Sequence, residues 1–184
     1  MFLRQRFVVK GFLSFIVVEI PEPIRSGVQS LRDSLGTAVA RLPVEITIAG
    51  SSGVGPILRG ADLSLVGRKL VRALSGFRAF SSSFSAIRCF PNTSTFYLEP
   101  VDRSPFDQLH QAVGASGIPF SESRWPYNPH CTLRMGEPFS AEAAADLLKR
   151  PIPREEFRID IVSVYGVDES LTNCQLLFQQ SLQA

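Results

Sequence analysis

The sequence has few of the residues that build disulfide frameworks and metal centres. Its 184 residues include three cysteines and two histidines, and no two cysteines form a Cys-x-x-Cys pair. An odd number of cysteines argues against a disulfide framework, and two histidines argue against a histidine-rich metal site. We therefore expect no metal, no cofactor and a cytoplasmic location, where thiols stay reduced.

The sequence also lacks an N-terminal apolar run of membrane-spanning length. The apolar stretch 11–18 ends at Glu19 and Pro21, and it is far below the ~20 residues that a span needs. No small-x-small cleavage site follows it, so a signal peptide is not expected. We expect a buried strand at this position and no membrane association.

Neither sign of charge dominates the sequence. Lys and Arg total 19 against 17 Asp and Glu, a formal net charge of +2 at pH 7. This balance excludes a protein that coats nucleic acid through charge alone. The hydrophobic fraction of 45% and charged fraction of 20% exclude disordered, collagen-like and coiled-coil chains. We expect a single domain over 1–184 without an obligate protein partner.

The two halves of the sequence repeat one order of predicted elements. β-Branched and aromatic residues predict strands over 12–20, 44–49, 77–89, 95–101, 130–135, 157–165 and 174–178. Apolar spacings of three and four predict helices over 24–39, 63–74, 104–113 and 140–149, the last two capped by Ser104 and Ser140. We expect an α+β bilobal fold with a pseudo-two-fold axis, lobes at 12–90 and 94–181, and antiparallel sheets around a central cleft.

The middle strands of the two halves carry matching residues. One reads PVEITI and the other reads NPHCTL. Because strand side chains alternate, Glu45 and Thr47 share one face, and His130, Thr132 and Arg134 share the equivalent face of the second strand. The residues between them are expected to point into the core. A cleft between two such strands is a natural ligand site.

The segment PHCTL resembles the His-x-Thr signature of the two-histidine (2H) phosphoesterases, the superfamily of bacterial 2′-5′ RNA ligase-like proteins and RNA cyclic phosphodiesterases. The opening FIVVEIPEPIRSGVQSLRDSL, the central FPNTSTFYLEPV and the closing hairpin are similar to that family as well. The resemblance spans about Leu13 to Phe178, and it includes the threonine of a first motif at Thr47.

The resemblance implies a metal-free reaction on a phosphodiester. In that family two histidines act as general acid and base, and two threonines hold phosphate oxygens. Carried onto this sequence, His130 is catalytic, and Thr47 and Thr132 bind phosphate. Imidazole suits the task because its pKa near 6.5 lets it accept or donate a proton near neutral pH. The implied partner is a nucleotide or RNA end with a 2′,3′-cyclic phosphate or a 2′-5′ linkage.

The sequence departs from the family pattern at Glu45, which stands where the first motif has its histidine. A carboxylate ~5 Å from a phosphate charge is repelled by about 3 kcal/mol at an effective dielectric of ~20, which weakens binding about a hundredfold. Three interpretations stay open. Glu45 is a working acid held protonated, or it marks a partly degenerate site and pairs with an arginine such as Arg134, Arg124 or Arg59. In the third, the ligand is no longer an ordinary phosphodiester.

Two functions therefore follow from the sequence. One is a metal-independent phosphodiesterase of the 2′-5′ RNA ligase-like type with a partly degenerate site. The other is a catalytically impaired protein that binds nucleotides or RNA ends on the same fold. A third possibility, a scaffold that has lost the site, is disfavoured by the retained Thr47, Thr132 and His130.

Other residues near the motifs also allow two interpretations. Arg134 contacts phosphate or is a solvated surface arginine. Trp125 and Tyr127 stack on a nucleobase or cover the core. The segment GSSGVGP over 50–56 is an anion-binding backbone nest or a plain loop. His110 is expected to pack against its neighbours rather than to act in catalysis.

Overall fold

The computed structural model describes residues 13–168 and 173–184, and it confirms an α+β fold with antiparallel sheets. The strands are β1 (Leu13–Glu19), β2 (Glu45–Ala49), β3 (Phe80–Ser82), β4 (Phe84–Cys89), β5 (Phe96–Pro100), β6 (Cys131–Arg134), β7 (Phe157–Ile159), β8 (Ile161–Val167) and β9 (Cys174–Ser181). The α-helices are α1 (Ile24–Ser34), α2 (Leu63–Leu74), α3 (Ser104–Gly114) and α4 (Ala141–Leu148), and a 3-10 helix, η1, spans Ala38–Arg41. The predicted order of elements is confirmed, although the strands predicted over 77–89 and 157–165 are each divided in two.

Helix ends follow local hydrogen bonding. Ser140 caps α4 as expected, because its hydroxyl accepts a hydrogen bond from the N–H of Ala143. The cap predicted at Ser104 is wrong. Ser104 is the first residue of α3, and its own N–H donates to Oδ1 of Asp102 at 2.8 Å. The first predicted helix also stops at Ser34, so the last part of the 24–39 pattern belongs to η1.

Strands from the two halves of the sequence pair with each other in the same sheet. The described residues form a four-stranded sheet in the order β2-β1-β8-β9, a three-stranded sheet β4-β5-β6 and a two-stranded pair β3-β7. The division at 12–90 and 94–181 therefore does not describe which strands pair. Alternating side chains show which face of a strand is buried, but not which edge bonds to which. Here β8 pairs along β1, from Leu13 opposite Val167 to Val18 opposite Val162.

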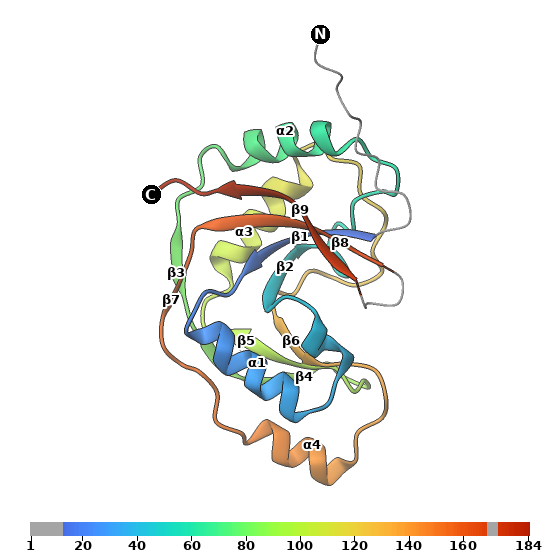
Figure 1. Cartoon of the computed structure of the whole chain (residues 1–184), viewed down its shortest axis with the longest axis vertical. Coiled ribbons are helices and arrows are strands. Elements are labelled where there is room, and N and C mark those ends of the chain that lie inside the picture. The colour runs from blue at the N-terminus through green and yellow to red at the C-terminus, as the bar shows by residue number, and fades with distance from the viewer. Residues whose placement is uncertain (1–12, 169–172) are drawn as a thin grey trace.

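Helices from each half of the sequence likewise pack on a sheet that contains strands of the other half (Figure 1). Helices α2 and α3 contact β9 and β2 of the four-stranded sheet, whereas α1 and α4 contact β6 and β4 of the three-stranded sheet. Helix α1 follows β1 in sequence and yet packs on the other sheet. Helix α1 therefore lies beside β6, one of the two motif strands β2 and β6, whose Cα atoms come within 8 Å of each other.

The buried sides of the two motif strands contribute to one hydrophobic cluster. Ile46, Ile48, Cys131 and Leu133 are fully buried, which confirms the alternation predicted from the sequence. This packing fixes the opposite faces, which carry the polar residues. A slip by one residue would exchange the buried and polar faces of a strand, so the same packing also fixes the register of each strand.

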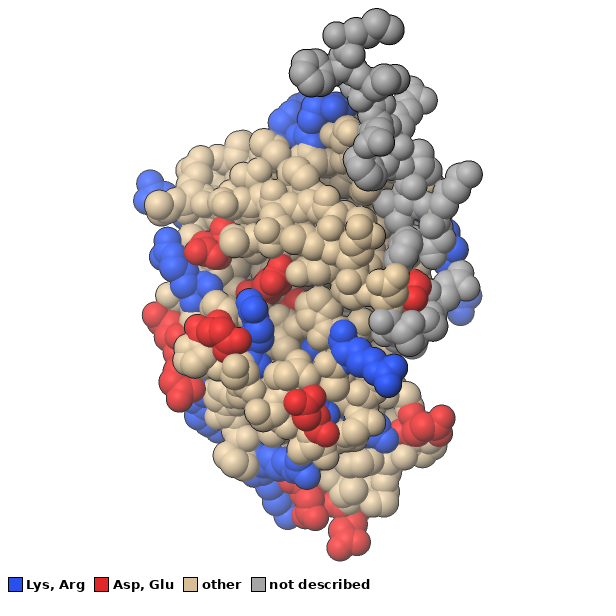
Figure 2. Space-filling view, in the orientation of Figure 1, with Lys and Arg blue, Asp and Glu red and all other residues tan. Residues whose placement is uncertain are grey.

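The face of the molecule seen in Figure 2 shows no concentration of one charge among the described residues. Figure 2 shows Lys and Arg side chains interspersed with Asp and Glu on the face in view. This distribution agrees with the small net charge and gives no indication of a charged binding surface on that face. In the described part of the chain, every helix is too short or too polar to cross a membrane.

Candidate functional site

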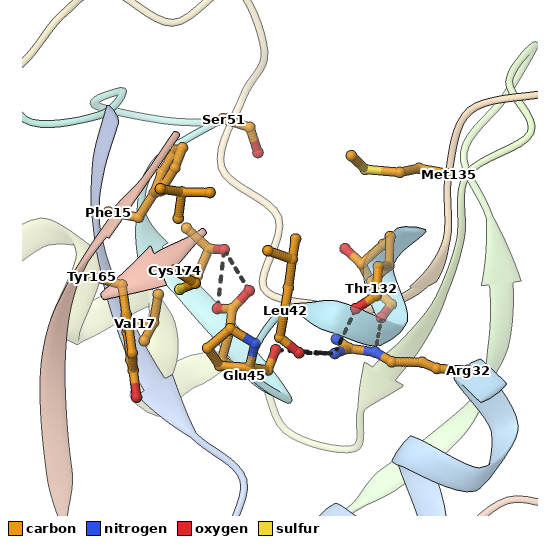
Figure 3. Close-up of a pocket in the computed structure, with 14 residues that line it drawn as sticks. Phe15, Val17, Arg32, Leu42, Glu45, Ser51, Thr132, Met135, Tyr165 and Cys174 are labelled. Atoms are coloured by element: carbon orange, nitrogen blue, oxygen red, sulfur yellow. Dashed lines mark hydrogen bonds between the residues drawn. The ribbon is translucent and has the colours of Figure 1, made fainter. Parts of the chain in front are cut away.

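A pocket of about 180 Å³ lies where β1, β2, the β8–β9 hairpin and the segment around η1 meet the second motif strand. Its walls are mostly apolar, with a small number of polar groups among them (Figure 3). The lining residues are Phe15, Val17, Arg32, Val39, Leu42, Pro43, Glu45, Thr47, Ser51, Thr132, Met135, Tyr165, Val167 and Cys174. The pocket thus brings together Glu45, Thr47 and Thr132, three of the residues predicted from the sequence. Concave, largely apolar sites with few polar groups are typical of ligand sites.

Both motif strands carry a β-bulge at the same place. In β2, Thr47 lies opposite Val17 and Ala49 lies opposite Ile16, so Ile48 is an extra residue. In β6, the register also shifts by one residue directly after the motif threonine. Bulges are common beside active sites because they re-aim side chains. The equivalent positions of the two bulges support the predicted correspondence of the strands.

Glu45 is held in an environment that favours its neutral form. The Thr47 hydroxyl lies 3.2 and 3.1 Å from the two carboxyl oxygens of Glu45 and donates a hydrogen bond to the carboxyl group. Burial raises the pKa of Glu45 to about 7, while the charge of Arg32 and the Thr47 hydrogen bond lower it. The Glu45 carboxyl therefore changes protonation state near neutral pH, which suits a proton donor or acceptor.

Arg32 is the cation that acts on Glu45, and it lies outside the two strand motifs found in the sequence. Its guanidinium comes from α1 and lines the pocket with Glu45 (Figure 3). Arg134, Arg124 and Arg59, the partners suggested from the sequence, do not line the pocket. A signal for Arg32 does exist in the sequence. It follows Ile24 and Val28 at spacings of four, on the buried face of its helix.

His130 lies directly before β6, and its ring packs edge-on against two aromatic rings. The ring centroids of Phe90 and Tyr97 are 5.0 and 5.2 Å from that of His130. Nδ1 lies 2.6 Å from the carbonyl oxygen of Asn128. Because a carbonyl can only accept, Nδ1 carries the proton and Nε2 is left as an acceptor. Burial lowers the pKa of His130, so the neutral ring predominates at pH 7. His130 is not among the pocket-lining residues.

Arg134 does not share the face of His130 and Thr132, contrary to the sequence expectation. Because of the bulge in β6, Arg134 lies opposite Phe96 rather than continuing the alternation. Its guanidinium sits 4.4 Å from the ring centroid of Phe139, and Nη2 donates to the carbonyl oxygen of Glu137 at 3.0 Å. The side chain is thus occupied beside the sheet, away from the pocket.

Tyr127 supports the first motif strand instead of offering a free face. Its ring stacks on that of His110, with centroids 3.8 Å apart and planes within 2°. The Tyr127 hydroxyl donates to the carbonyl oxygen of Thr47, and His110 Nδ1 bonds to that of Ile48. The two aromatic residues considered for nucleobase stacking therefore differ: Tyr127 covers the core, whereas Trp125 is 71% exposed.

The 50–56 segment forms part of the pocket rim. Ser51 lines the pocket, and its carbonyl oxygen accepts a hydrogen bond from the Ser123 hydroxyl. The N–H of Gly53 donates to the carbonyl oxygen of Trp125, so this donor is already used within the protein. A Cβ on Gly53 would lie 2.1 Å from the His110 ring, where no side chain fits. The segment is a tightly packed connecting loop.

The described residues contain no group of three or more His, Cys, Asp or Glu side chains arranged to hold a metal ion. The polar groups that line the pocket are hydroxyls, one carboxyl, one guanidinium and one thiol. Such a set binds an anionic or uncharged polar ligand more readily than a cation when the carboxyl is protonated.

Comparisons with known proteins agree with this arrangement. The sequence profile of the 2′-5′ RNA ligase superfamily matches residues 20–170. Among solved structures, LigT of E. coli complexed with NADP+ has a TM-score of 0.63 at 14% identity, covering 95% of this chain and 99% of that chain. LigT complexed with 3′-AMP has a TM-score of 0.62 at 14% identity and covers 95% of this chain and 100% of that chain.

A similar fold occurs in the protein TT0787 of Thermus thermophilus, with a TM-score of 0.64 at 15% identity, covering 94% of this chain and 98% of that chain. At such low identity the likeness of all these structures shows the shared fold. No curated protein matches the chain in sequence.

Proposed function

The chain belongs to the 2′-5′ RNA ligase superfamily, and we propose that it is a metal-independent phosphodiesterase that acts on 2′,3′-cyclic phosphates or 2′-5′ linkages at nucleotide or RNA ends. One observation carries the proposal: Thr47 and Thr132, from two strands with equivalent bulges, line one pocket together with Glu45. Two hydroxyls from opposite sides can donate to two oxygens of one phosphate.

Glu45 and His130 divide the proton transfers. Nε2 of His130 is an acceptor, so it takes a proton from the attacking water. The water oxygen bonds to phosphorus as the bond from phosphorus to the leaving ribose oxygen breaks. Glu45, whose pKa is about 7, gives its proton to that oxygen. Two titratable groups whose surroundings both favour the neutral form suit these complementary roles.

The substitution at Glu45 makes the site an altered version of the family pattern. When protonated, Glu45 does not repel a phosphate, so the penalty of about 3 kcal/mol expected from two like charges is avoided. The hydroxyl of Thr47 donates to Glu45 in the free protein. It must turn toward the phosphate when ligand binds, which removes a hydrogen bond that lowers the pKa of Glu45 and so favours the protonated carboxyl.

The apolar part of the pocket suits the base or ribose of a nucleotide. LigT has been crystallised with 3′-AMP, ATP and NADP+, and we extend this preference for nucleotides to the present chain. Phe15 and Met135 lie on the pocket wall and provide apolar contact area. Trp125, exposed beside the rim loop, is our candidate for stacking on a further base of an RNA end.

A second function is favoured by one observation. His130 does not line the pocket, and its ring packs against Phe90 and Tyr97 instead. A protein in which this histidine stays there would hold a nucleotide or RNA end between its threonines without turning it over. This alternative is a binding protein with a degenerate site.

Hydrolysis of a nucleoside 2′,3′-cyclic phosphate in the presence of a chelator tests the proposal. The wild type should turn over, and His130→Ala should lose about a thousandfold in kcat, within the usual range for removing a general base. Free imidazole should restore part of the activity of the variant, which a merely misfolded protein would not show. Tight binding of intact nucleotide without turnover would favour the second function. Neither binding nor turnover would reject both.

A further inference from the structure

Arg32 is a fully buried cation. Its side chain is 1% exposed, on the face of α1 that also carries Ile24 and Val28. Within the described residues it forms no ion pair with a carboxylate. Burying a charge is costly unless hydrogen bonds compensate it. Neutral acceptors supply that compensation here.

The acceptors lie in β6, in η1 and in the segment directly before β2, and they include the carbonyl oxygen of Val39, 3.3 Å from Nη1. Nε of Arg32 donates to the carbonyl oxygen of Thr132 in β6 at 2.9 Å. Nη1 donates to the carbonyl oxygens of Leu42 and Pro43, just before β2, at 2.9 and 3.0 Å. Nη2 lies 3.9 Å from the sulfur of Cys131, also in β6. Figure 3 shows the guanidinium between Thr132 and the Leu42 segment.

The geometry of this contact requires a guanidinium. Arg presents five N–H donors in one fixed plane, so it can bond to carbonyls that lie in different directions. A lysine carries its three donors on a single nitrogen at the end of a flexible chain. It could retain the positive charge but could not span the same set of carbonyl oxygens.

We propose that Arg32 is a positioning residue that fixes the spacing of the two motif strands, so that Thr47 and Thr132 reach oxygens of the same anion. Only one part of this inference rests on the proposed function, namely that the anion is a phosphate. The inferred coupling of the strands is argued from the hydrogen bonds of Arg32 and does not depend on which anion binds.

The charge of Arg32 provides a separate readout. It lowers the pKa of Glu45 against the effect of burial, so a neutral replacement should raise the pKa of Glu45 further. A replacement that keeps the charge should leave that pKa closer to its wild-type value while it loosens the strands. Charge and geometry can therefore be separated with two variants.

The test compares Arg32→Lys and Arg32→Gln with wild type. Hydrogen exchange should become faster in 43–49 and 130–134 of both variants, while exchange in α2 and β9 stays unchanged. The dissociation constant for inorganic phosphate should rise about tenfold and kcat should fall about a hundredfold, the scale expected for a displacement of about 1 Å. In 13C-labelled protein, the Glu45 titration should move to higher pH in Arg32→Gln and much less in Arg32→Lys.

Arg25→Lys is the matched control. Arg25 also lies on α1 and donates to one carbonyl oxygen, that of Ile20, but does not line the pocket. It should change none of the measured quantities. Folded Arg32 variants with wild-type exchange in both motif segments would overturn the inference, as would exchange that accelerates equally throughout the protein.

Failure of the proposed function would be recognised separately. If the wild type neither hydrolyses the cyclic phosphate nor binds inorganic phosphate, the function is rejected. Hydrogen exchange and the Glu45 titration would still decide whether Arg32 couples the strands. If Arg32→Lys does not fold, the same decision falls to Arg32→Gln, which keeps a donor for Thr132.

Discussion

Strands β2 and β6 repeat one backbone design with different surroundings. Each has its extra residue immediately after the motif threonine. The neighbouring strand places Val17 opposite Thr47 but Tyr97 opposite Thr132. Both threonines line the apolar pocket, but Glu45 of the first motif lies in it as well, whereas His130 of the second motif lies against aromatic rings. The backbone is alike in both strands, and the neighbouring side chains make the two sites chemically different.

The ionisable groups of the two motifs respond to burial in opposite directions. Burial raises the pKa of Glu45 to about 7 and lowers that of His130. Both shifts favour the neutral form, which leaves one group with a proton to give and the other with a lone pair to accept one. Under the proposed function, the carboxyl would therefore act as the acid and the imidazole as the base of one site.

Glu45→Gln is expected to have the largest effect on catalysis, because it removes the proposed proton donor of the first motif. The variant should lose about a hundredfold in kcat on a cyclic phosphate. The steady-state rate at pH 6 measures this effect. A matched change, Glu99→Gln, alters a carboxylate that pairs with Arg88 outside the pocket and should leave the rate unchanged. Wild-type activity in Glu45→Gln would contradict the role of Glu45.

The same variant should become more stable in alkaline solution. Since the folded pKa of Glu45 is raised from 4.5 to about 7, its contribution to stability is fully present below pH 4.5. That contribution is lost as the pH rises through 7. Above pH 7 the gain from Glu45→Gln should approach about 3 kcal/mol, the free-energy equivalent of the shift. Urea unfolding from pH 4 to 8 would reveal it, and parallel curves for both proteins would disprove it.

Replacing each threonine in turn measures what each motif strand contributes to anion binding. Thr47→Ala and Thr132→Ala should each weaken binding of inorganic phosphate by roughly tenfold to a hundredfold, since each removes a hydrogen bond to a charged group. Thr47→Ala alone should also raise the pKa of Glu45, because the Thr47 hydrogen bond lowers it. Calorimetry and 13C titration measure the two effects. Serine at either position is the control that keeps the hydroxyl.

The pH dependence of kcat/KM should reflect both motifs. His130 must be neutral, which requires a pH above its lowered pKa. Glu45 must be protonated, which requires a pH below about 7. We expect a bell-shaped profile with a slightly acidic optimum and a tenfold fall per pH unit well above pH 7. A rate that stays constant from pH 7 to 9 would rule out Glu45 as the acid.

Tyr127→Phe should have the smallest effect, because it removes one neutral hydrogen bond behind the first motif. The hydroxyl donates to the carbonyl oxygen of Thr47, and its loss should cost about 1 kcal/mol of folding stability. Phosphate affinity should fall by a few-fold at most. Thermal unfolding and phosphate titration check this expectation. An effect as large as that of Thr47→Ala would mean that Tyr127 itself contacts the ligand.

Local patterns in the sequence predicted the polar and buried faces of both motif strands. Alternation placed Thr47 and Thr132 on the polar faces and Ile46 and Cys131 in the core, as the structure has them. It failed at Arg134, because the bulge before it changes the alternation without any mark in the sequence. A strand pattern can therefore be trusted only up to the first irregularity.

The remaining features depend on contacts between distant segments. Pairing of β8 with β1 joins residues far apart in the chain, and no local pattern encodes it. Arg32 is informative only once its side chain is known to bond both to β6 and to the segment before β2. Likewise, Tyr127 and His110 meet because a loop crosses α3. The residues of the two motifs could thus be found from local patterns. The side chains that hold the motif strands in place, Arg32, Tyr127 and His110, are recognised only from tertiary contacts.

The order of strands also sets when the pocket can form during synthesis. Strand β1 is near the start of the chain, but its partner β8 is made late: Val18 pairs with Val162. At roughly 5–20 residues per second, a ribosome needs on the order of 10–30 s to make the intervening segment. Until then β1 has an open edge, and the wall formed by Tyr165 and Cys174 does not exist. A nascent chain would therefore carry the complete first motif without its binding pocket, and that edge would be open to chaperones or to mispairing.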